Sequence, residues 1–393
     1  MENSRYLIVG GGLTADAACK GIREIDPDGT IMLVGEEPHP PYARPPLSKA
    51  LWKGDDEDTI WCGTSELGVD LRLGRTIVSL DLPACEATGD SGETYGYERL
   101  LLATGGHPRR LPFGGDEVIY FRTLDDYRYL RALADGGARF LVIGGSFIGS
   151  EIAAALAMNG WPVTMVFPEP GIGARIFPAD LSAFVTGYYR DRGVVLLPEA
   201  SVAGIERTGG VARVATKDGR TLETDVIVAG LGIEPRTELA AAAGLPVEDG
   251  IIVDERGRVR GHEDVFAAGD VARFPAAALD KTMRVEHEDH AKSHGRLAGI
   301  NMAGAEESYD YLPFFYSDLF DLGYEAVGEL DPRGETLAEW EEPNRKGVVY
   351  YLDTERHPRG VLLWNVFGRV EAARDLIRAH QPIDAGTLSE LAG

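Results

Sequence analysis

The pattern of apolar and small residues in the first 36 positions predicts a strand, a glycine turn, a helix and a second strand. Residues 6–9 and 31–34 are continuous apolar runs of the length of buried strands. Between them, residues 10–15 read Gly-Gly-Gly-Leu-Thr-Ala, a G-x-G-x-x-A pattern that opens an alanine-rich helix. In a dinucleotide-binding turn of this kind, the first glycine allows a tight bend and the second lets a pyrophosphate approach the backbone.

Glu36 strengthens this interpretation, because it follows the second strand 26 residues after Gly10. An acid at that place accepts hydrogen bonds from the hydroxyls of a ribose, while the amides at the helix start face the pyrophosphate. The small Ala15 would let the helix pack closely on the strand. The strand, the turn, the spacing and the acid together predict a dinucleotide site.

The same unit occurs a second time, 134 residues later. Residues 140–143 form an apolar run, residues 144–149 read Gly-Gly-Ser-Phe-Ile-Gly, and a second strand is predicted over residues 163–167. Two such units in one chain are typical of a protein that holds FAD in the first copy and a nicotinamide dinucleotide in the second. The alternative is that one of the copies only packs a helix on a sheet.

The second unit departs from the first in two ways. Ser146 replaces the middle glycine, which narrows the approach of a pyrophosphate, and Pro168 delays the acid by one residue, so that Glu169 is the predicted ribose contact. No arginine stands at that position to hold a 2′-phosphate, so NADH is the preferred donor. Arg175 is close enough in sequence to leave NADPH open.

The segment after Glu36 is rich in proline around two cations, Arg44 and Lys49. The prolines predict a stiff extended path that resumes as helix after Pro46. The segment is either a rigid loop or a holder of cations near a flavin. Glu151, early in the second helix, either favours the helix dipole or pairs with Lys49.

Further strands are predicted over residues 76–82 and 98–104, and residues 100–106 contain an Ala-Thr-Gly turn at the end of the second of these strands. Residues 226–235 are predicted to be a strand that leads into a glycine turn. Residues 265–270 are predicted to be a strand that ends in Gly269 and Asp270, where the aspartate can bond a ribityl chain, and a helix is predicted over 286–301. From about residue 305 the pattern changes to aromatic-rich strands at 312–318, 347–352 and 360–365, followed by a helix after Val370.

These elements predict an α/β protein with two Rossmann-like dinucleotide-binding domains and a smaller mixed α+β C-terminal domain. The FAD domain is expected to be discontinuous, over residues 1–115 and 246–304. The nicotinamide domain is inserted over 116–245, and the C-terminal domain covers 305–393.

Composition restricts the partners. The 393 residues carry a formal net charge of −24, which argues against nucleic acid or an anionic membrane as a partner. No apolar run reaches the length of a membrane span, and the first strand begins by residue 6, so a cytoplasmic protein is expected. The three cysteines form no closely spaced pair, which excludes a redox dithiol beside the flavin and predicts no metal site.

Four longer motifs extend this pattern. They cover residues 42–52 (Tyr-Ala-Arg-Pro-Pro-Leu-Ser-Lys-Ala-Leu-Trp), 284–299, 316–328 and 347–367. With them, the chain resembles, nearly from end to end, the FAD-dependent reductases that include apoptosis-inducing factor and the ferredoxin reductases of bacterial oxygenases. In that family the position of Tyr316 is commonly tryptophan. The mitochondrial leader, basic DNA-binding surface and long C-terminal insertion of the animal protein are not expected here, so its cell-death role is not carried over.

The resemblance implies that Arg44, Lys49, Arg122, Asp270 and His287 contact FAD, and that Lys49 pairs with Glu151 beside the flavin. It also implies that Phe147, Glu169, Gly232, Glu286 and Glu325 contact the nicotinamide dinucleotide. With the fingerprint residues, the candidate cofactor-binding set is Gly10, Gly12, Leu13, Thr14, Glu36, Arg44, Lys49, Val78, Ala103, Thr104, Gly105, Arg122, Gly269, Asp270, Glu286, His287, Tyr316, Gly144, Gly145, Phe147, Ile148, Gly149, Glu169, Gly232 and Glu325. Lys49 and Glu151 are the candidate catalytic residues.

The expected reaction is hydride transfer from NADH to FAD, with electrons passed to an acceptor. Three classes of function stay open. The protein is a reductase of a ferredoxin or rubredoxin, a reductase of a quinone or other small molecule, or a slow NADH-responsive protein of the apoptosis-inducing-factor type that changes its shape or dimerisation. A monomer or homodimer is expected.

Overall fold

The computed structural model describes residues 2–384. The chain forms two compact units. Unit 1 contains residues 2–43, 58–107 and 234–313, and unit 2 contains residues 44–57, 108–233 and 314–384. The chain leaves unit 1 after His107 and returns at Glu234. The boundaries expected for three functional domains cut the chain at other places and stay a prediction.

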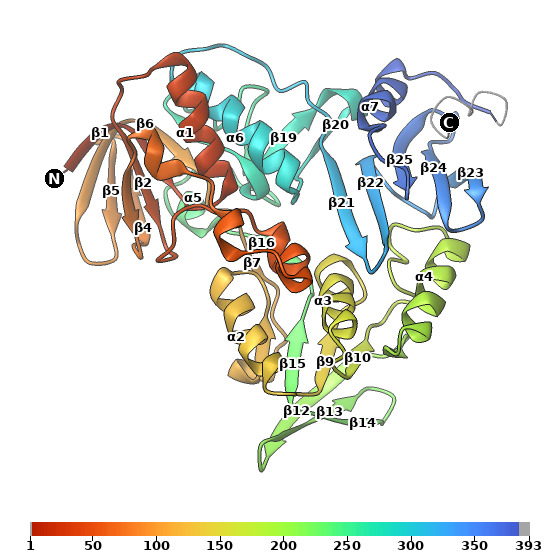
Figure 1. The fold of residues 1–393 in the computed structure, drawn as a ribbon. Coiled ribbons are helices and arrows are strands. Elements are labelled where there is room, and N and C mark those ends of the chain that lie inside the picture. Colours follow the sequence, from red (N-terminus) through yellow and green to blue (C-terminus); the bar gives the residue numbers. More distant parts are fainter. Residues whose placement is uncertain (1, 385–393) are drawn as a thin grey trace. The chain divides into compact units, whose positions relative to one another are not determined.

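Unit 1 is built on a mostly parallel sheet in the order β3-β2-β1-β6-β5-β4, with β18 paired to β6. Figure 1 labels β1, β2, β4, β5 and β6 of this sheet. Its main elements are β1 (Glu2–Val9), α1 (Leu13–Ile25), β2 (Ile31–Gly35), β3 (Asp70–Leu73), β4 (Ile77–Asp81), β5 (Glu86–Gly89), β6 (Thr94–Leu102), α5 (Glu238–Ala242), β17 (Ile251–Ile252), β18 (Val265–Ala267), β19 (Ala272–Ala276), β20 (Lys281–Met283) and α6 (Glu288–Met302). Strand β6 is long enough to pair antiparallel with β5 at its start and parallel with β18 at its end.

The register brings the ends of three strands of unit 1 to one edge of the sheet. Val9 pairs with Leu102, and Leu102 pairs with Ala267. The turns that follow β1, β6 and β18 therefore start side by side. Two of the predicted cofactor-binding turns and the Gly269–Asp270 turn are thereby collected at the carboxyl edge of the strands, where open α/β sheets bind ligands.

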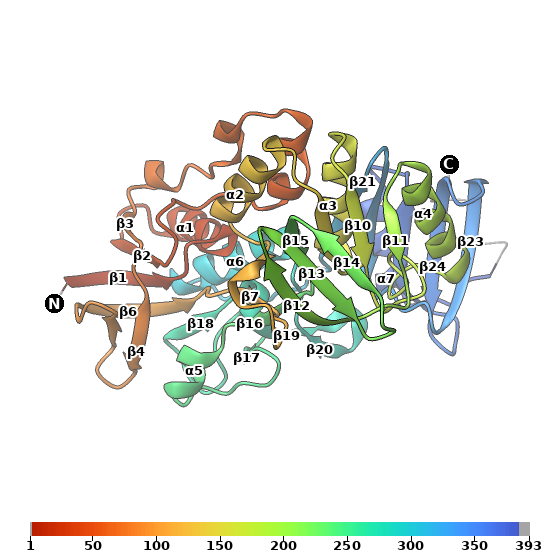
Figure 2. The same ribbon diagram turned by 90° about the horizontal axis from the view of Figure 1, so that it is seen from below.

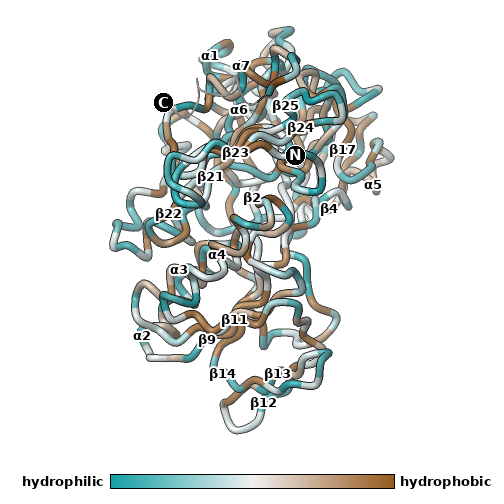
Figure 3. The backbone as a smooth tube through the Cα atoms, turned by 90° about the vertical axis from the view of Figure 1, so that its right-hand side faces the viewer, coloured by the Kyte–Doolittle hydropathy of each residue, from teal (hydrophilic) through white to brown (hydrophobic). Residues whose placement is uncertain are grey.

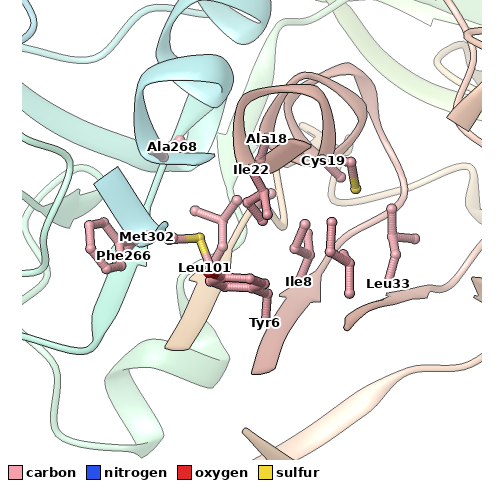
Figure 4. Close-up of a cluster of buried hydrophobic side chains, with 14 residues drawn as sticks. Tyr6, Ile8, Ala18, Cys19, Ile22, Leu33, Leu101, Phe266, Ala268 and Met302 are labelled. Atoms are coloured by element: carbon pink, nitrogen blue, oxygen red, sulfur yellow. The ribbon is translucent and has the colours of Figure 1, made fainter. Parts of the chain in front are cut away.

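The core of unit 1 lies between this sheet and the helices α1 and α6. Figure 4 shows Tyr6, Ile8, Leu101 and Phe266 of the strands beneath Ile22 of α1, and all of them are buried. The two helices pack unusually closely because Gly295 and Gly299 of α6 face α1. A Cβ at Gly295 would lie 2.4 Å from the Thr14 carbonyl oxygen, and one at Gly299 would lie 2.2 Å from that of Ala18.

Unit 2 contains a parallel sheet in the order β11-β10-β9-β15-β8, with a three-stranded meander, β12-β13-β14, visible side by side in Figure 2. Its elements in this part are β8 (Val118–Tyr120), α2 (Leu124–Asp135), β9 (Phe140–Ile143), α3 (Phe147–Met158), β10 (Val163–Val166), α4 (Ala179–Asp191), β11 (Val195–Leu197), β12 (Val202–Thr208), β13 (Val211–Thr216), β14 (Thr221–Thr224) and β15 (Val226–Ala229). Strands β9 and β11 are hydrophobic in Figure 3, and β9 is buried along its whole length, as expected of a parallel strand covered on both faces.

The C-terminal part of unit 2 is an antiparallel sheet in the order β21-β22-β25-β24-β23 with one helix. Its elements are β21 (Phe314–Leu319), β22 (Leu322–Gly328), β23 (Glu335–Glu342), β24 (Lys346–Leu352), β25 (Pro358–Trp364) and α7 (Val370–Ala379). The change from a parallel to an antiparallel sheet matches the change of pattern near residue 305. The end of the last predicted domain, residues 385–393, lies outside the described residues.

The proline-rich segment resumes as helix near Pro46, as predicted. The helix is of the 3₁₀ type and is divided into two turns, Pro45–Ser48 and Ala50–Lys53. The break between them is at Lys49, whose backbone has φ −131° and ψ −92° and cannot continue a helix. Among the described residues no helix is both long and apolar enough to cross a membrane.

Candidate functional site

The first glycine turn has the geometry of an anion cradle. Gly10 has φ +129°, and a Cβ there would lie 2.1 Å from the Ala103 carbonyl oxygen, so only glycine fits. A Cβ at Gly12 would meet nothing within 4 Å. Gly12 also precedes α1 without a side chain capping the helix start, so the first amides of α1 are open to a ligand such as a pyrophosphate. This open space is what FAD needs at that position.

Glu36 lies just past β2, where the sequence predicted a ribose contact. The structure adds a residue that the sequence analysis missed, because the Glu36 carboxylate accepts a hydrogen bond from the guanidinium of Arg236. Arg236 is itself held by its backbone, since Thr104 Oγ1 donates to the Arg236 carbonyl at 2.8 Å and Arg236 N donates to the Gly105 carbonyl at 2.9 Å. No sequence signal links residues 200 positions apart.

The return turn joins α1 directly. Gly269 has φ +73°, and a Cβ there would lie 2.1 Å from Thr14 Oγ1, so the turn that carries Asp270 touches the first glycine turn. Arg284, also missed, donates to the Asp270 carbonyl at 3.2 Å and to the Glu286 carboxylate at 2.6 Å. Burial lowers the pKa of His287 to about 4 against the opposing effect of Asp270, so this ring is neutral at pH 7.

The second glycine turn, in unit 2, repeats this geometry. Gly144 has φ +116°, and a Cβ there would lie 2.3 Å from the Gly230 carbonyl oxygen. Gly149 approaches the turn so closely that a Cβ would lie 2.1 Å from the Gly144 carbonyl oxygen. Ser146 is the residue before α3 and makes no side-chain cap, so its hydroxyl leaves the first amides of that helix open to an anion.

Glu169 follows β10 as predicted, and Arg175 is its partner. Arg175 Nε donates to Glu169 Oε1 at 2.6 Å. The Glu169 side chain is 19% exposed and the Arg175 side chain 73%, so the acid is held in place while the cation extends into solvent. This arrangement suits a ribose with two free hydroxyls, and it also keeps a cation near the place of a 2′-phosphate.

The predicted pair of Lys49 and Glu151 is present in unit 2. Lys49 Nζ lies 2.7 Å from Glu151 Oε1, and the two side chains are 10% and 3% exposed. Two further donors that the sequence analysis missed reach the same carboxylate, Ser48 Oγ at 2.6 Å and Ser317 Oγ at 2.6 Å. A buried carboxylate that accepts hydrogen bonds from three donors is held in one position.

Other predicted residues of unit 2 also meet. Arg44 Nη1 donates to the Arg122 carbonyl at 3.0 Å. Tyr316 of β21 and Glu325 of β22 are directly opposite each other in the antiparallel pair, and the Tyr316 ring centroid lies 5.3 Å from Lys49 Nζ. The proline-rich segment, α3 and the C-terminal sheet therefore contribute to one cluster.

The predicted residues divide between the two units as follows. Unit 1 holds Gly10, Gly12, Leu13, Thr14, Glu36, Val78, Ala103, Thr104, Gly105, Gly269, Asp270, Glu286 and His287, and unit 2 holds Arg44, Lys49, Arg122, Gly144, Gly145, Phe147, Ile148, Gly149, Glu151, Glu169, Gly232, Tyr316 and Glu325. Val78 lies in β4 with 55% of its surface exposed. Its contact to a cofactor stays a prediction, as do the other individual cofactor contacts.

All three cysteines are free thiols, and Cys19 is buried in the core of unit 1. Burial raises the pKa of the Cys62 thiol to about 11, so that thiol is uncharged at pH 7. Within residues 2–384 no cluster of three or more His, Cys, Asp or Glu residues could hold a metal ion.

A family model for pyridine nucleotide-disulphide oxidoreductases matches residues 4–295. The chain belongs to this family. Apoptosis-inducing factor 1 of Dictyostelium discoideum is 33% identical to it, over 98% of this chain and 80% of its own length. Monodehydroascorbate reductase 2 of Arabidopsis thaliana is 34% identical, over 92% of this chain and 90% of its own.

The similarity extends to solved structures. The crystal structure of the covalent putidaredoxin reductase–putidaredoxin complex contains a chain that is 28% identical, with a TM-score of 0.91 over 99% of this chain and 96% of that one. The α/β fold with two Rossmann-like units and a C-terminal domain is thereby confirmed, as is the resemblance to FAD-dependent reductases. The chain is an FAD-dependent NAD(P)H oxidoreductase that passes electrons to an acceptor.

Proposed function

We propose that this family member oxidises NADH and passes the electrons to a small protein carrier of the ferredoxin or rubredoxin kind. The observation that carries the proposal is the likeness, over nearly all of both chains, to a reductase solved in complex with putidaredoxin. That likeness includes the C-terminal sheet, which supplies Ser317 to the Lys49 and Glu151 cluster.

The residues of the chain divide the work of hydride transfer. FAD, when bound, supplies the hydride-accepting chemistry. The open amides after Gly12 would hold its pyrophosphate, and Glu36 with Arg236 would hold its adenosine ribose. The open amides after Ser146, together with Glu169, would hold NADH in the same way. Lys49, held by its pair with Glu151, would supply a fixed positive field and a hydrogen-bond donor to the flavin as it accepts the hydride.

The preference for NADH rests on Glu169. Its carboxylate accepts hydrogen bonds from the two ribose hydroxyls of NADH but repels the 2′-phosphate of NADPH. Arg175 lies beside Glu169 and donates a hydrogen bond to it. The negative charge of Glu169 therefore weakens the attraction between Arg175 and a 2′-phosphate. We expect NADPH to reduce the flavin more slowly than NADH.

The net charge of −24 determines how the reaction with a charged carrier depends on ionic strength. Small iron–sulfur carriers are acidic as well, so two acidic proteins would repel each other at long range, and salt would screen that repulsion. Reduction of an acidic carrier should accordingly become faster as ionic strength rises towards 0.15 M. A carrier attracted by opposite charge would show the reverse dependence.

The test is anaerobic reduction of the protein with NADH and with NADPH, followed by mixing with a ferredoxin, a quinone or oxygen. Rapid reoxidation by the ferredoxin alone supports the proposal. The likeness to apoptosis-inducing factor 1 favours a second candidate, a slow NADH-responsive protein. A stable long-wavelength absorption band after NADH, with slow reoxidation by every acceptor and a change of mass in light scattering, would support that candidate instead. Rapid reoxidation by the quinone alone would indicate a small-molecule acceptor.

A further inference from the structure

The Glu151 carboxylate is the point at which three separate segments of unit 2 meet. Lys49 and Ser48 reach it from the proline-rich segment, Ser317 reaches it from β21, and Glu151 itself lies on α3. Ser317 is 1% exposed and Glu151 is 3% exposed. Because the group is almost completely removed from water, every donor must come from the protein.

The Ser317 hydroxyl can take part in more than one hydrogen bond. Serine has one hydroxyl hydrogen and two acceptor lone pairs. The Ser317 hydrogen is given to Glu151 Oε1 at 2.6 Å. The Ser317 hydroxyl also interacts with the phenol of Tyr324, and this interaction lowers the pKa of the phenol against the larger effect of burial. Ser317 therefore links Tyr324 to Glu151 and, through Glu151, to Lys49.

Tyr324 is well placed to hold Ser317 still. It lies opposite Ser317 in the β21–β22 pair, and its ring stacks on Trp364 with centroids 5.8 Å apart. Burial raises the pKa of Tyr324 well above its usual value, so the phenol keeps its hydrogen at any physiological pH. A rigid, buried partner beside Ser317 restricts the directions in which its hydroxyl can point.

We propose that Ser317, oriented by Tyr324, is a positioning residue for hydride transfer, because it holds Glu151 and thereby Lys49 in the place from which Lys49 acts on the flavin. This inference rests on the proposed function, in which Lys49 contacts the flavin. Lys49 has Glu151 on one side and the ring of Tyr316, the neighbour of Ser317, on the other. Movement of β21 would change both contacts at once.

Ser48 cannot take over this role. It is the last residue of the first 3₁₀ turn and directly precedes Lys49, and its hydroxyl also lies 3.4 Å from the Pro45 carbonyl. Ser48 therefore moves together with Lys49 and cannot fix the position of Lys49 relative to the rest of unit 2. Ser317 ties the pair to a buried sheet, which is the independent support that a pre-organised charge requires.

The experiment compares holoenzymes of wild type, Ser317→Ala, Ser317→Thr, Tyr324→Phe and Ser182→Ala. Ser182 is the matched control, since it is a buried serine of unit 2 that donates one 2.8 Å hydrogen bond to the Ile172 carbonyl. Stopped-flow mixing with NADH gives the limiting rate of flavin reduction and the dissociation constant for NADH. Dye-coupled titration gives the midpoint potential of the bound flavin, a readout that does not depend on turnover.

A hydrogen bond to a charged group is lost in Ser317→Ala, and we expect flavin reduction to slow about tenfold with an unchanged dissociation constant for NADH. The midpoint potential should fall, because the positive field at the flavin weakens. Ser317→Thr should restore both quantities, Tyr324→Phe should show a smaller effect in the same direction, and Ser182→Ala should match wild type.

Equal rates and potentials in Ser317→Ala and Ser182→Ala would overturn the inference while leaving the proposed function intact. Failure of NADH to reduce wild type would instead refute the proposed function itself. If Ser317→Ala does not retain FAD, Tyr324→Phe decides the matter, because it removes one oxygen and keeps the stacked ring. A rate and potential equal to those of wild type in that variant would then overturn the inference.

Discussion

Lys49 Nζ lies 2.7 Å from Glu151 Oε1 in a site where both side chains are almost fully buried. Taking two charges out of water costs several kcal/mol for each ion, so a buried pair is weak support for stability as such. Two serine hydroxyls lower that cost here by filling further acceptor positions of the carboxylate. The retention of such a pair, where an apolar pair would pack equally well, is the physical reason to assign it a role in the reaction.

The first prediction concerns Lys49→Ala. Loss of one pre-organised electrostatic group near the reacting atoms typically costs a factor of about 10²–10³ in rate, so flavin reduction by NADH should slow by about that factor. Anaerobic stopped-flow absorbance measures it. The control is Lys53→Ala, four residues away, where the lysine is 44% exposed and pairs only loosely with Asp318 at 3.4 Å.

Lys49→Ala also leaves Glu151 buried without its cation, which destabilises a fold by about 3–5 kcal/mol. The double variant Lys49→Met with Glu151→Leu separates the two effects, because it removes both charges and keeps apolar volume. We expect this variant to be more stable in urea than Lys49→Ala, although the hydroxyls of Ser48 and Ser317 lose their acceptor, and to be as slow as Lys49→Ala. A double variant that reduces its flavin at the wild-type rate would remove the pair from the reaction.

The second prediction compares two glycines of the first turn. Gly12→Ala should fold, since the new methyl group has open space in the structure, but it should lose FAD because the methyl occupies the approach of the pyrophosphate. Gly10→Ala should instead damage folding, because a Cβ would lie 2.1 Å from the Ala103 carbonyl oxygen and φ is +129°. The ratio of flavin to protein absorbance, with circular dichroism for the fold, distinguishes the two outcomes. Full retention of FAD in Gly12→Ala would contradict the placement of the pyrophosphate.

The third prediction concerns the choice of donor. Glu169→Ala removes a charged acceptor of the ribose hydroxyls, and a loss of about 1.5–3 kcal/mol corresponds to a 10- to 100-fold weaker binding of NADH. It also frees Arg175, which Glu169 engages at 2.6 Å, so the ratio of kcat/KM for NADPH to that for NADH should rise. Arg175→Ala is the control and should leave NADH binding unchanged while lowering the residual rate with NADPH. An unaltered donor ratio in Glu169→Ala would place the ribose elsewhere.

The periodicity of the sequence was sufficient to predict both Rossmann-like units and the change of architecture near residue 305, because parallel strands are short continuous apolar runs beside glycine turns. The pairing of Lys49 with Glu151 was predicted from the family resemblance and is present. Ser48, Ser317, Arg236 and Arg284 were missed. Isolated serines and arginines carry no local pattern, and only the folded chain shows that Ser317 lies beside a residue 166 positions earlier.

The same limit applies to backbone detail. The helix predicted after Pro46 is divided into two 3₁₀ turns by a break at Lys49, since the local proline pattern does not report the tertiary contacts that hold Lys49 outside helical geometry. Similarly, α6 begins at Glu288 rather than at Glu286. The predicted helix included Glu286 and His287, which instead lie between β20 and α6. Both are residues for which a cofactor contact is expected. Boundaries of elements next to a site are set by the site as much as by propensity.

The last prediction uses a buried histidine cluster in unit 1. His290 and His294 of α6 have no exposed surface and pack against Phe274, with ring centroids 4.7 and 5.2 Å away. Burial lowers the pKa of His294 to about 3 and that of His290 well below its usual value, and the neighbouring histidines lower the latter further. Both rings are therefore neutral in the folded protein at pH 7.

The sign of the pH dependence follows from proton binding. Below about pH 6.5 the unfolded chain binds protons on these histidines while the folded chain does not. The free energy of unfolding should hence fall as the pH is lowered from about 6.5, by about 1.4 kcal/mol per pH unit for each fully titrating histidine. For His294 the fall continues until the folded-state value of about 3 is reached.

His294→Gln should make the free energy of unfolding less dependent on pH, because one titrating group is removed. This holds whatever the effect of the substitution on stability at pH 7. Urea unfolding at several pH values between 4 and 7 measures it. The control is His262→Gln, in the loop before β18, where the ring is partly exposed and we expect the slope of wild type. If His294→Gln and wild type lose stability in parallel across this range, the histidine must already be charged in the folded protein, and the buried cluster must contain a compensating group close to its ring.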